Sequence, residues 1–293
     1  MRRVLHIAIG FSLVTGLVWL GQFAIDDRSE RRMLLAVNPA ETRPLLDAAV
    51  LLLTDFSIPT VGVVLAAWLL GYAAWARGVA EGAALRRAFL LAGALVGVAV
   101  AAVLTPGYEQ RVVPWLVIPF AVGAFGLAGA SFSAPAPQLR RAARLIGVML
   151  LCVALTEAAM ELIDTFSGGR LRPLHSQNTH WNGALRILED EKVQYGTSYV
   201  SGHAAGLFAL LTPLFWTTRR PGIRVALLLW GTAHAWSRVY VAAHYPYCVL
   251  MGSLLGIGIA SWVVWSLAPT RRETPRAQPT TAEAAGAAVP SGS

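Results

Sequence analysis

The chain has 293 residues, of which 56% are hydrophobic and 14% are charged, and its formal net charge is +8 at pH 7. Water-soluble domains carry more charge and fewer apolar residues, so this composition excludes an ordinary soluble protein and predicts a membrane protein. The positive charge does not indicate nucleic-acid binding, because the arginines fall in short clusters between apolar runs and form no continuous basic stripe.

Apolar runs of about 20 residues follow one another along the chain, and each is long enough to cross a hydrocarbon core about 30 Å thick. The first run lacks an Ala-x-Ala-like cleavage site, so we interpret it as an uncleaved helix. The runs predict an all-α, polytopic membrane helix bundle of about eight transmembrane helices. They cover residues 4–25, 48–76, 86–106, 112–132, 142–164, 199–218, 223–242 and 246–267.

Arginine clusters fall in every second loop between these runs, which predicts that these loops are cytoplasmic. Both termini are then cytoplasmic, and the other loops, among them 26–47 and 165–198, face outward. We expect a multi-pass protein of a cell membrane, such as a bacterial inner membrane, whose outward loops face the periplasm or the exterior. The clusters are Arg2 and Arg3; Arg77, Arg86 and Arg87; Arg140, Arg141 and Arg144; Arg219, Arg220 and Arg224; Arg271 and Arg272.

Three parts of the chain differ in composition and in the motifs they carry. Residues 1–141 are expected to form N-terminal transmembrane helices, and residues 142–268 a catalytic transmembrane core. Residues 269–293 are rich in Pro, Thr, Ala, Gly and Ser, which predicts a disordered cytoplasmic tail. Cys152 and Cys248 are expected at different membrane depths, so no disulfide is predicted.

Polar residues that suit a phosphate group stand near the outer ends of the last three apolar runs. Ser201 and Gly202 precede His203 at a helix start, where unpaired N–H groups and the helix dipole favour an anion. Arg238 lies near the outer end of an apolar run, and a charged residue within a membrane span is functional by default. His244 begins a proline-bounded turn, and its imidazole is able to attack phosphorus or to carry a proton.

Each of these residues alone has an ordinary structural explanation. Ser201 suits an N-cap, Arg172 suits an outer loop at the lipid headgroups, and His244 suits a membrane boundary. We interpret His234 in this ordinary way. The combination, in this order and at this spacing, indicates a phosphate site. No residue cluster indicates a metal ion, and no cofactor is predicted.

The pattern Ser-Gly-His, then Ser-Arg-x5-His, preceded by Arg172-Pro173, resembles the three signature motifs of the type 2 phosphatidic acid phosphatase superfamily. This superfamily includes membrane lipid phosphatases and soluble vanadium haloperoxidases, and the resemblance covers residues 142–267. It implies that His244 is the nucleophile of a phosphohistidine intermediate, and that His203 protonates the departing lipid oxygen and later activates water. It also implies that no metal is needed. The residues that it assigns to phosphate binding are Arg172, Ser201, Gly202 and Arg238.

The chain departs from the family pattern at two positions. Cys248 stands where the third motif has an aspartate; in hydrolases of the Ser-His-Asp type, the aspartate orients the imidazole and stabilises its charge. A Cys248→Asp variant is therefore expected to raise turnover. Thr165 stands where the first motif has a lysine, and Arg170 is a candidate to restore that charge from a shifted position.

Three carboxylates at helical spacing in the run before the outer loop are candidates to orient His244 in place of the missing aspartate. An equally good interpretation is that they form ion pairs or hydrogen bonds between helices. They are Glu157, Glu161 and Asp164.

The leading functional hypothesis is an integral membrane lipid phosphatase that acts at the outer membrane face on a phosphomonoester or diphosphate of a phospholipid, lipid A or isoprenoid. One alternative is a lipid phosphotransferase that uses the same intermediate. Another is a degenerate, non-catalytic member that binds phosphorylated lipids. The expected partners are a phosphate-bearing lipid and the bilayer, and the sequence leaves the identity of the lipid and the oligomeric state open.

Overall fold

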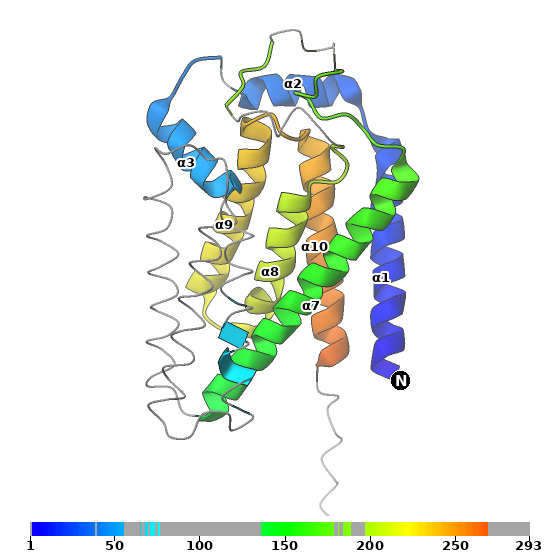
Figure 1. Ribbon diagram of the computed structural model, residues 1–293, viewed down its shortest axis with the longest axis vertical. Helices are drawn as coiled ribbons and strands as arrows, with labels where there is room; N and C mark the ends of the chain where they lie inside the picture. The colour runs from blue at the N-terminus through cyan, green and yellow to red at the C-terminus, as the bar shows by residue number, and fades with distance from the viewer. Residues whose placement is uncertain are drawn as a thin grey trace, which may run out of the picture.

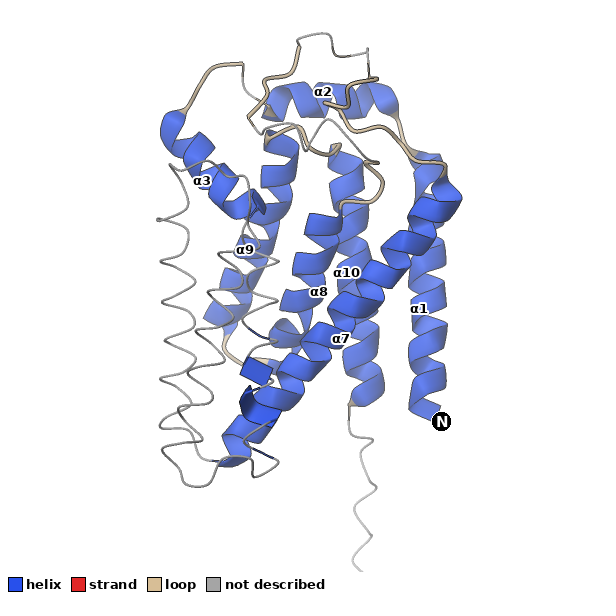
Figure 2. Ribbon diagram, in the orientation of Figure 1, coloured by secondary structure: helices blue, strands red, loops and turns tan. Residues whose placement is uncertain are grey.

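A computed structural model describes residues 2–38, 40–55, 136–178, 181, 184–188 and 197–268, together with a few positions between 65 and 76. Within these residues, every regular element is a helix (Figure 2). This agrees with the all-α class that the sequence predicts. The predicted runs 86–106 and 112–132 and the tail 269–293 lie outside the described residues, so the count of eight helices remains a prediction.

Three of the described helical segments are long and apolar enough to cross a membrane, namely Arg2–Ala24, Ala136–Ser167 and Pro246–Leu267. The first contains α1 (Arg2–Gly21) and a short 3-10 turn, and the other two are α7 and α10. Two further helices of the described residues, α8 (Gly202–Thr217) and α9 (Pro221–Tyr240), pack with them (Figure 1). Each of the helices α1, α7, α8, α9 and α10 coincides with one predicted apolar run.

Helix α8 lies at the centre of the bundle and is buried along most of its length. It packs closely against α10 because two glycines of α10 present bare backbone to it. A Cβ atom at Gly252 would collide with the carbonyl oxygen of Ser201, and one at Gly256 would collide with that of Ala205. Small residues at a helix crossing let two backbones approach, which is the usual way that helices pack in membranes.

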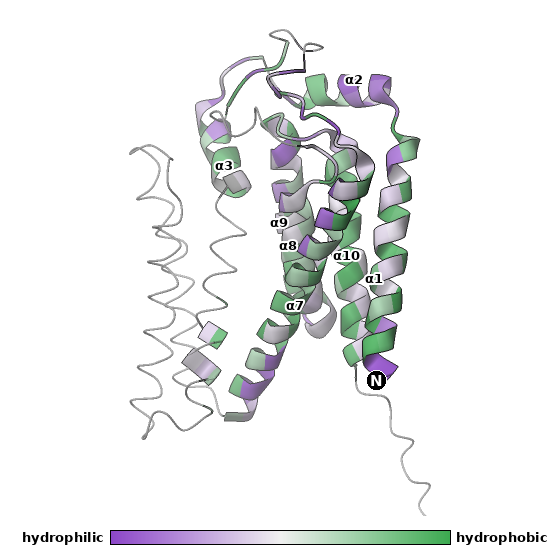
Figure 3. Cartoon of the chain, turned by 45° about the vertical axis from the view of Figure 1, so that its right-hand side comes forward, coloured by the Kyte–Doolittle hydropathy of each residue, from purple (hydrophilic) through white to green (hydrophobic). Residues whose placement is uncertain are grey.

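The predicted outer loop 26–47 contains a helix that the sequence analysis did not predict, α2 (Asp27–Val37), and the start of α3 (Pro44–Asp55). The Asp26 carboxylate accepts a hydrogen bond from the backbone N–H of Arg28, which caps α2. Helix α2 runs across one end of the bundle (Figure 1), and polar and apolar residues are mixed along it, whereas α1 and α10 are mainly apolar (Figure 3). The short α2 therefore covers the bundle end and does not span it.

The two ends of the bundle differ in what they carry. The start of α1 and the end of α10 lie at the end opposite α2 (Figure 1). The segment after α7, the start of α8 and the turn between α9 and α10 lie toward α2. The three sequence motifs therefore gather at one end of the bundle, and which side of the membrane this end faces remains a prediction.

Candidate active site

The start of α8 forms one wall of the site. Helix α8 begins at Gly202 with Ser201 as its N-cap, as the sequence predicts, but the Ser201 side chain makes no capping hydrogen bond. Its Oγ is buried and has no hydrogen-bond partner among the described residues. The backbone N–H of Ser201 donates to the carbonyl of Cys248 at 3.1 Å, which joins the start of α8 to α10. The Ser201 hydroxyl and the first-turn N–H groups therefore form a site suited to an anion.

His244 lies in the turn between α9 and α10 and is only 2% exposed. Its Nδ1 lies 2.9 Å from the carbonyl oxygen of Ser198. Because a carbonyl oxygen only accepts hydrogen bonds, Nδ1 carries the hydrogen, and the lone pair of the neutral ring lies on Nε2. His244 Nε2 is buried and has no hydrogen-bond partner in the described part of the chain. The ring thus presents its nucleophilic nitrogen to the site.

The charge around His244 favours this neutral form. Burial, together with the positive charges of Arg172 and Arg238, holds the pKa of His244 well below its usual range. Its imidazole is therefore neutral at physiological pH, which is the form that attacks phosphorus. His203, in the first turn of α8, lies within electrostatic reach of His244 and of both arginines.

His234, on α9, forms a further wall. It is fully buried, and its Nδ1 lies 2.5 Å from the carbonyl oxygen of Leu53. Its ring stacks on the ring of His203, with the centroids 6.2 Å apart and the planes inclined by 24°. His234 is thus a buried, hydrogen-bonded histidine, and it also limits where the His203 ring can turn.

Two arginines are fixed beside the histidines by hydrogen bonds to neighbouring segments. Arg238 is 2% exposed, and its Nη1 donates to Thr54 Oγ1 of α3 at 2.9 Å. Ser237 Oγ also donates to Thr54, at 3.0 Å. Arg172 donates through Nε to the carbonyl of Thr197 at 3.0 Å. These bonds fix the directions of two permanent cations, which suits the charge that a phosphoryl group carries.

The three candidate carboxylates lie elsewhere. Glu157, Glu161 and Asp164 are all exposed on α7. Asp164 accepts a hydrogen bond from the Thr197 hydroxyl at 2.7 Å, next to the backbone that binds His244. The partner of His244 Nδ1 is the Ser198 carbonyl, not a carboxylate as expected from the sequence. A backbone carbonyl is able to fix the tautomer of the ring, but it lacks the full negative charge that would stabilise an imidazolium.

The position of the missing aspartate is occupied by a buried thiol with polar neighbours. Cys248 Sγ accepts a hydrogen bond from Ser198 Oγ at 3.4 Å, and it lies 3.8 Å from Nη1 of Arg170. Arg170 is ion-paired with Glu30 of α2, and at 2.6 Å with Asp27. The candidate replacement for the missing lysine is thus held beside the third motif.

Glu30 connects α2 to this part of the site. It is 2% exposed, and its carboxylate binds Arg170 through one oxygen and accepts the backbone N–H of Tyr247 at 2.7 Å through the other. A carboxylate from α2 therefore lies near Cys248, where the family pattern has an aspartate. A chain of contacts runs from Glu30 through Arg170, Cys248 and Ser198 to His244.

Sequence reasoning missed Glu30, Thr54 and Ser198. The sequence does predict a capped amphipathic helix at Asp26 and Asp27, because a stretch of mixed polar and apolar residues follows them. This prediction would have placed Glu30 on a helix. Thr54 and Ser198 carried no such signal. Ser198 binds His244 through its backbone carbonyl, which every residue type has.

A second cluster of polar side chains binds the part of the outer loop 165–198 around Arg186. Both Nη atoms of Arg186 bind the Asp47 carboxylate of α3, at 2.7 and 2.8 Å, and the Tyr240 hydroxyl donates to Asp47 at 2.8 Å. The hydrogen bonds from Arg186, which outweigh the effect of burial, hold the pKa of Asp47 well below its usual range. Asn38 binds the Arg186 and Tyr240 carbonyls. The described part of the loop is therefore fixed to α2 and α3.

Three described helical segments are long and apolar enough for a membrane protein, and histidines and arginines lie close together at one end of the bundle. Residues 145–272, which contain all three sequence motifs, match the family model of the PAP2 superfamily. The resemblance seen in the motifs is thereby confirmed.

A curated relative is similar over part of the same chain. It is the lipid A 4'-phosphatase of Bacteroides thetaiotaomicron, which is 28% identical over 100 residues, or 34% of this chain and 43% of the relative. The aligned region thus spans less than half the length of this relative. No solved structure matches the chain.

Proposed function

We propose that the protein is an integral membrane lipid phosphatase that removes phosphate from a phosphomonoester or diphosphate in a lipid headgroup. The observation that carries this proposal is the state of His244. Its Nδ1–H is held by the Ser198 carbonyl, and its buried Nε2 has no partner among the described residues. Two fixed arginines and the start of α8 surround it. The superfamily match supports the same reaction class.

In the first step, the phosphate binds between Arg172, Arg238 and the first turn of α8. His244 Nε2 attacks phosphorus, and the bond from phosphorus to the lipid oxygen breaks. His203, whose protonated form the negative charge of the bound phosphate favours, gives its proton to that oxygen. The lipid then leaves as an alcohol or, from a diphosphate, as the shortened phosphate. The positive charge of the phosphohistidine ring is balanced by the phosphoryl group that it carries.

In the second step, a water molecule attacks the phosphohistidine. His203, which is now neutral, accepts a proton from this water, the N–P bond breaks, and inorganic phosphate is released. Both histidines return to their starting states. The arginines act in both steps, because negative charge on the equatorial oxygens is present in each transition state.

The location of the site supports a lipid substrate. His203 lies in the first turn of α8, and His244 lies two residues before α10, a helix long and apolar enough to cross a membrane. The ends of such helices lie at the depth of lipid headgroups. The named activity of the relative makes lipid A one candidate substrate. Phosphatidate, phosphatidylglycerophosphate and undecaprenyl diphosphate are others. We place the protein in a bacterial inner membrane, with the site facing the periplasm.

The test uses purified protein in detergent with a panel of these lipids, and follows inorganic phosphate and phosphorylated lipid products separately. Release of inorganic phosphate, together with an acid-labile phosphoprotein that His244→Ala abolishes, is the expected result. Transfer of phosphate to a second lipid without release would replace the proposal by a phosphotransferase. Binding without turnover of any lipid would replace it by a phosphate-binding protein.

A further inference from the structure

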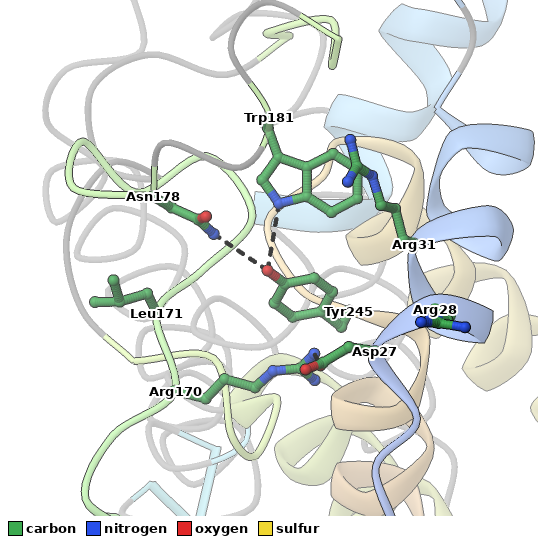
Figure 4. Close-up of a pocket in the computed structure, with 8 residues that line it drawn as sticks. All are labelled: Asp27, Arg28, Arg31, Arg170, Leu171, Asn178, Trp181 and Tyr245. Atoms are coloured by element: carbon green, nitrogen blue, oxygen red, sulfur yellow. Dashed lines mark hydrogen bonds and ion pairs between the residues drawn. The ribbon is translucent and has the colours of Figure 1, made fainter.

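A pocket of about 360 Å³ opens between α2 and the outer loop (Figure 4). Its walls come from α2, from the outer loop and from Tyr245, the residue that follows His244 in the chain. Tyr245 thus places one wall of the pocket a single residue along the chain from His244, whose own side chain does not line the pocket. The volume is at the small end of the range for ligand pockets and suits one ring-sized headgroup.

The walls of this pocket are basic. Arg28 and Arg31 of α2 and Arg170 of the loop line it, and Asp27 is the one acidic residue among the lining residues that the structure describes. Arg170 is partly neutralised by its ion pairs with Asp27 and Glu30. Three arginines and one aspartate thus stand among the described lining residues, and this excess of basic side chains favours an anionic occupant.

Aromatic rings hold two of these arginines in place. The guanidinium of Arg170 lies over the Tyr245 ring at 3.8 Å, and that of Arg31 lies over the Trp181 ring at 5.2 Å. The rings are themselves fixed, because Trp181 Nε1 and Asn178 Nδ2 both donate to the Tyr245 hydroxyl, at 3.4 and 3.1 Å (Figure 4). Restricting the arginines before binding lowers the entropy cost of holding an anion.

We propose that this pocket binds a second anionic group of the substrate headgroup while the first lies at His244. The preferred substrate is then a lipid whose headgroup carries a further phosphate or comparable anion on a ring-sized spacer. This inference rests on the proposed phosphatase function, since it concerns the same headgroup. It assigns substrate selection to Arg28 and Arg31, which lie outside the three motifs.

The test compares two synthetic glycolipids with the same acyl chains and the same hexose, one with a single phosphomonoester and the other with two. Dissociation constants are measured in a His244→Ala background, which blocks turnover, and KM values with the otherwise unmodified protein. We expect tighter binding of the two-phosphate lipid. Replacing Arg28 and Arg31 together by Ala should reduce that preference about tenfold, the size of one charge-assisted hydrogen bond.

Two control variants are compared with the variant in which Arg28 and Arg31 are replaced by Ala. Arg32→Ala removes an exposed arginine of α2 that does not line the pocket, and it should leave the preference unchanged. Replacing Arg28 and Arg31 by Lys keeps the charge and should retain most of the preference. An equal loss of affinity for both lipids in the alanine variant would show general attraction to an anionic surface and would overturn the proposal.

Two other outcomes are separated by the same measurements. If inorganic phosphate alters hydrolysis of the one-phosphate lipid only when Arg28 and Arg31 are present, the pocket takes a free anion and the headgroup proposal is overturned. Absence of hydrolysis with a preserved binding preference would refute the phosphatase function and leave the subsite standing. Hydrolysis without any binding preference would refute the subsite and leave the phosphatase function standing.

Discussion

The motif cluster on α8, α9 and α10 and the cover formed by α2 and the outer loop are built in opposite ways. In the motif cluster, the polar atoms are buried and several are bound by backbone groups, as His244 is by Ser198. In the cover, charged side chains bind one another over long stretches of chain, as Arg170 binds Glu30 and Arg186 binds Asp47. The residues of the motif cluster therefore lie near one another in the C-terminal part of the sequence. The residues that hold the cover in place come from both the N-terminal and the C-terminal half of the chain.

This difference predicts different consequences of mutation. A backbone partner cannot be removed by a substitution, so the motif cluster is most sensitive at the reacting side chains themselves. The cover depends on side-chain pairs, and loss of one partner leaves a buried or half-buried charge behind. We expect variants of the motif cluster to change the chemical step, and variants of the cover to change positioning, selectivity or stability.

The largest effect is expected for His244→Ala. It removes the proposed nucleophile, so kcat should fall by about 10^4-fold or more, the cost of losing the key member of a catalytic group. Phosphate release and phosphoprotein formation measure this. His234→Ala is a comparison in a buried histidine that we do not assign to the chemical step. An equal loss in both variants with no phosphoprotein in the wild type would contradict the assignment.

The next largest effect is expected at Glu30, where the two regions meet. Glu30→Gln removes the charge that holds Arg170 beside Cys248, and kcat should fall about tenfold with little change in KM. The rise in turnover expected for Cys248→Asp should then be greatest in the Glu30→Gln background. In the Cys248→Asp single variant, where Glu30 is unchanged, the new carboxylate would lie close to that of Glu30, and the two negative charges would repel each other.

This double exchange is measured as a cycle of four proteins, with the pH dependence of kcat recorded for each. A structural role of Glu30 alone predicts that Cys248→Asp fails to rescue the Glu30→Gln variant. Rescue, with a pH profile restored toward that of the wild type, would support positioning of His244 through the contacts of Arg170 and Cys248.

A smaller effect is expected for Thr54→Val, which keeps the shape of the side chain and removes the hydroxyl that receives hydrogen bonds from Arg238 and Ser237. Arg238 would keep its charge and lose a fixed direction. We expect kcat/KM to fall about fivefold to tenfold, which corresponds to about 1 kcal/mol. Steady-state kinetics with a lipid phosphate measures it. A loss as large as that of His244→Ala would mean that Thr54 has a more direct role.

The smallest effect on catalysis is expected for Asp47→Asn, which should instead lower stability. The folded-state pKa of Asp47 is below its unfolded value, so its contribution to stability is present above about pH 4 and is lost as the pH falls through the folded-state pKa. Near pH 7 the variant should lose about 3 kcal/mol in the free energy of unfolding, and its unfolding temperature should fall accordingly. Its melting temperature should depend less on pH below about 4.

This prediction is checked by thermal unfolding in detergent over a pH series, with Asp164→Asn as the control because Asp164 is an exposed carboxylate that binds Thr197. Equal pH dependence in the Asp47 variant and the wild type would contradict the role of the ion pair with Arg186. A large fall in kcat with little change in the unfolding temperature would mean that Asp47 acts in the reaction and does not only stabilise the cover.

The sequence by itself predicted a membrane protein and the candidate reacting groups. Apolar runs long enough to cross a bilayer are visible in the sequence, and α1, α7, α8, α9 and α10 fall on them because hydrophobic length is a local property. His203, His244, Arg172 and Arg238 were visible as well, since the motif spacing sets each of them at a helix end or in a neighbouring loop. The structure brings these four side chains together at one end of the bundle.

The tertiary structure alone decided what surrounds them. The hydrogen bond from His244 to Ser198, the carboxylate of Glu30 beside Cys248 and the basic pocket under α2 join residues far apart in the sequence. Pairing of this kind depends on which helix faces cross, and no local pattern records it. The expectation that an α7 carboxylate would orient His244 failed for this reason, because helical spacing places Glu157, Glu161 and Asp164 on one face without saying which way that face points.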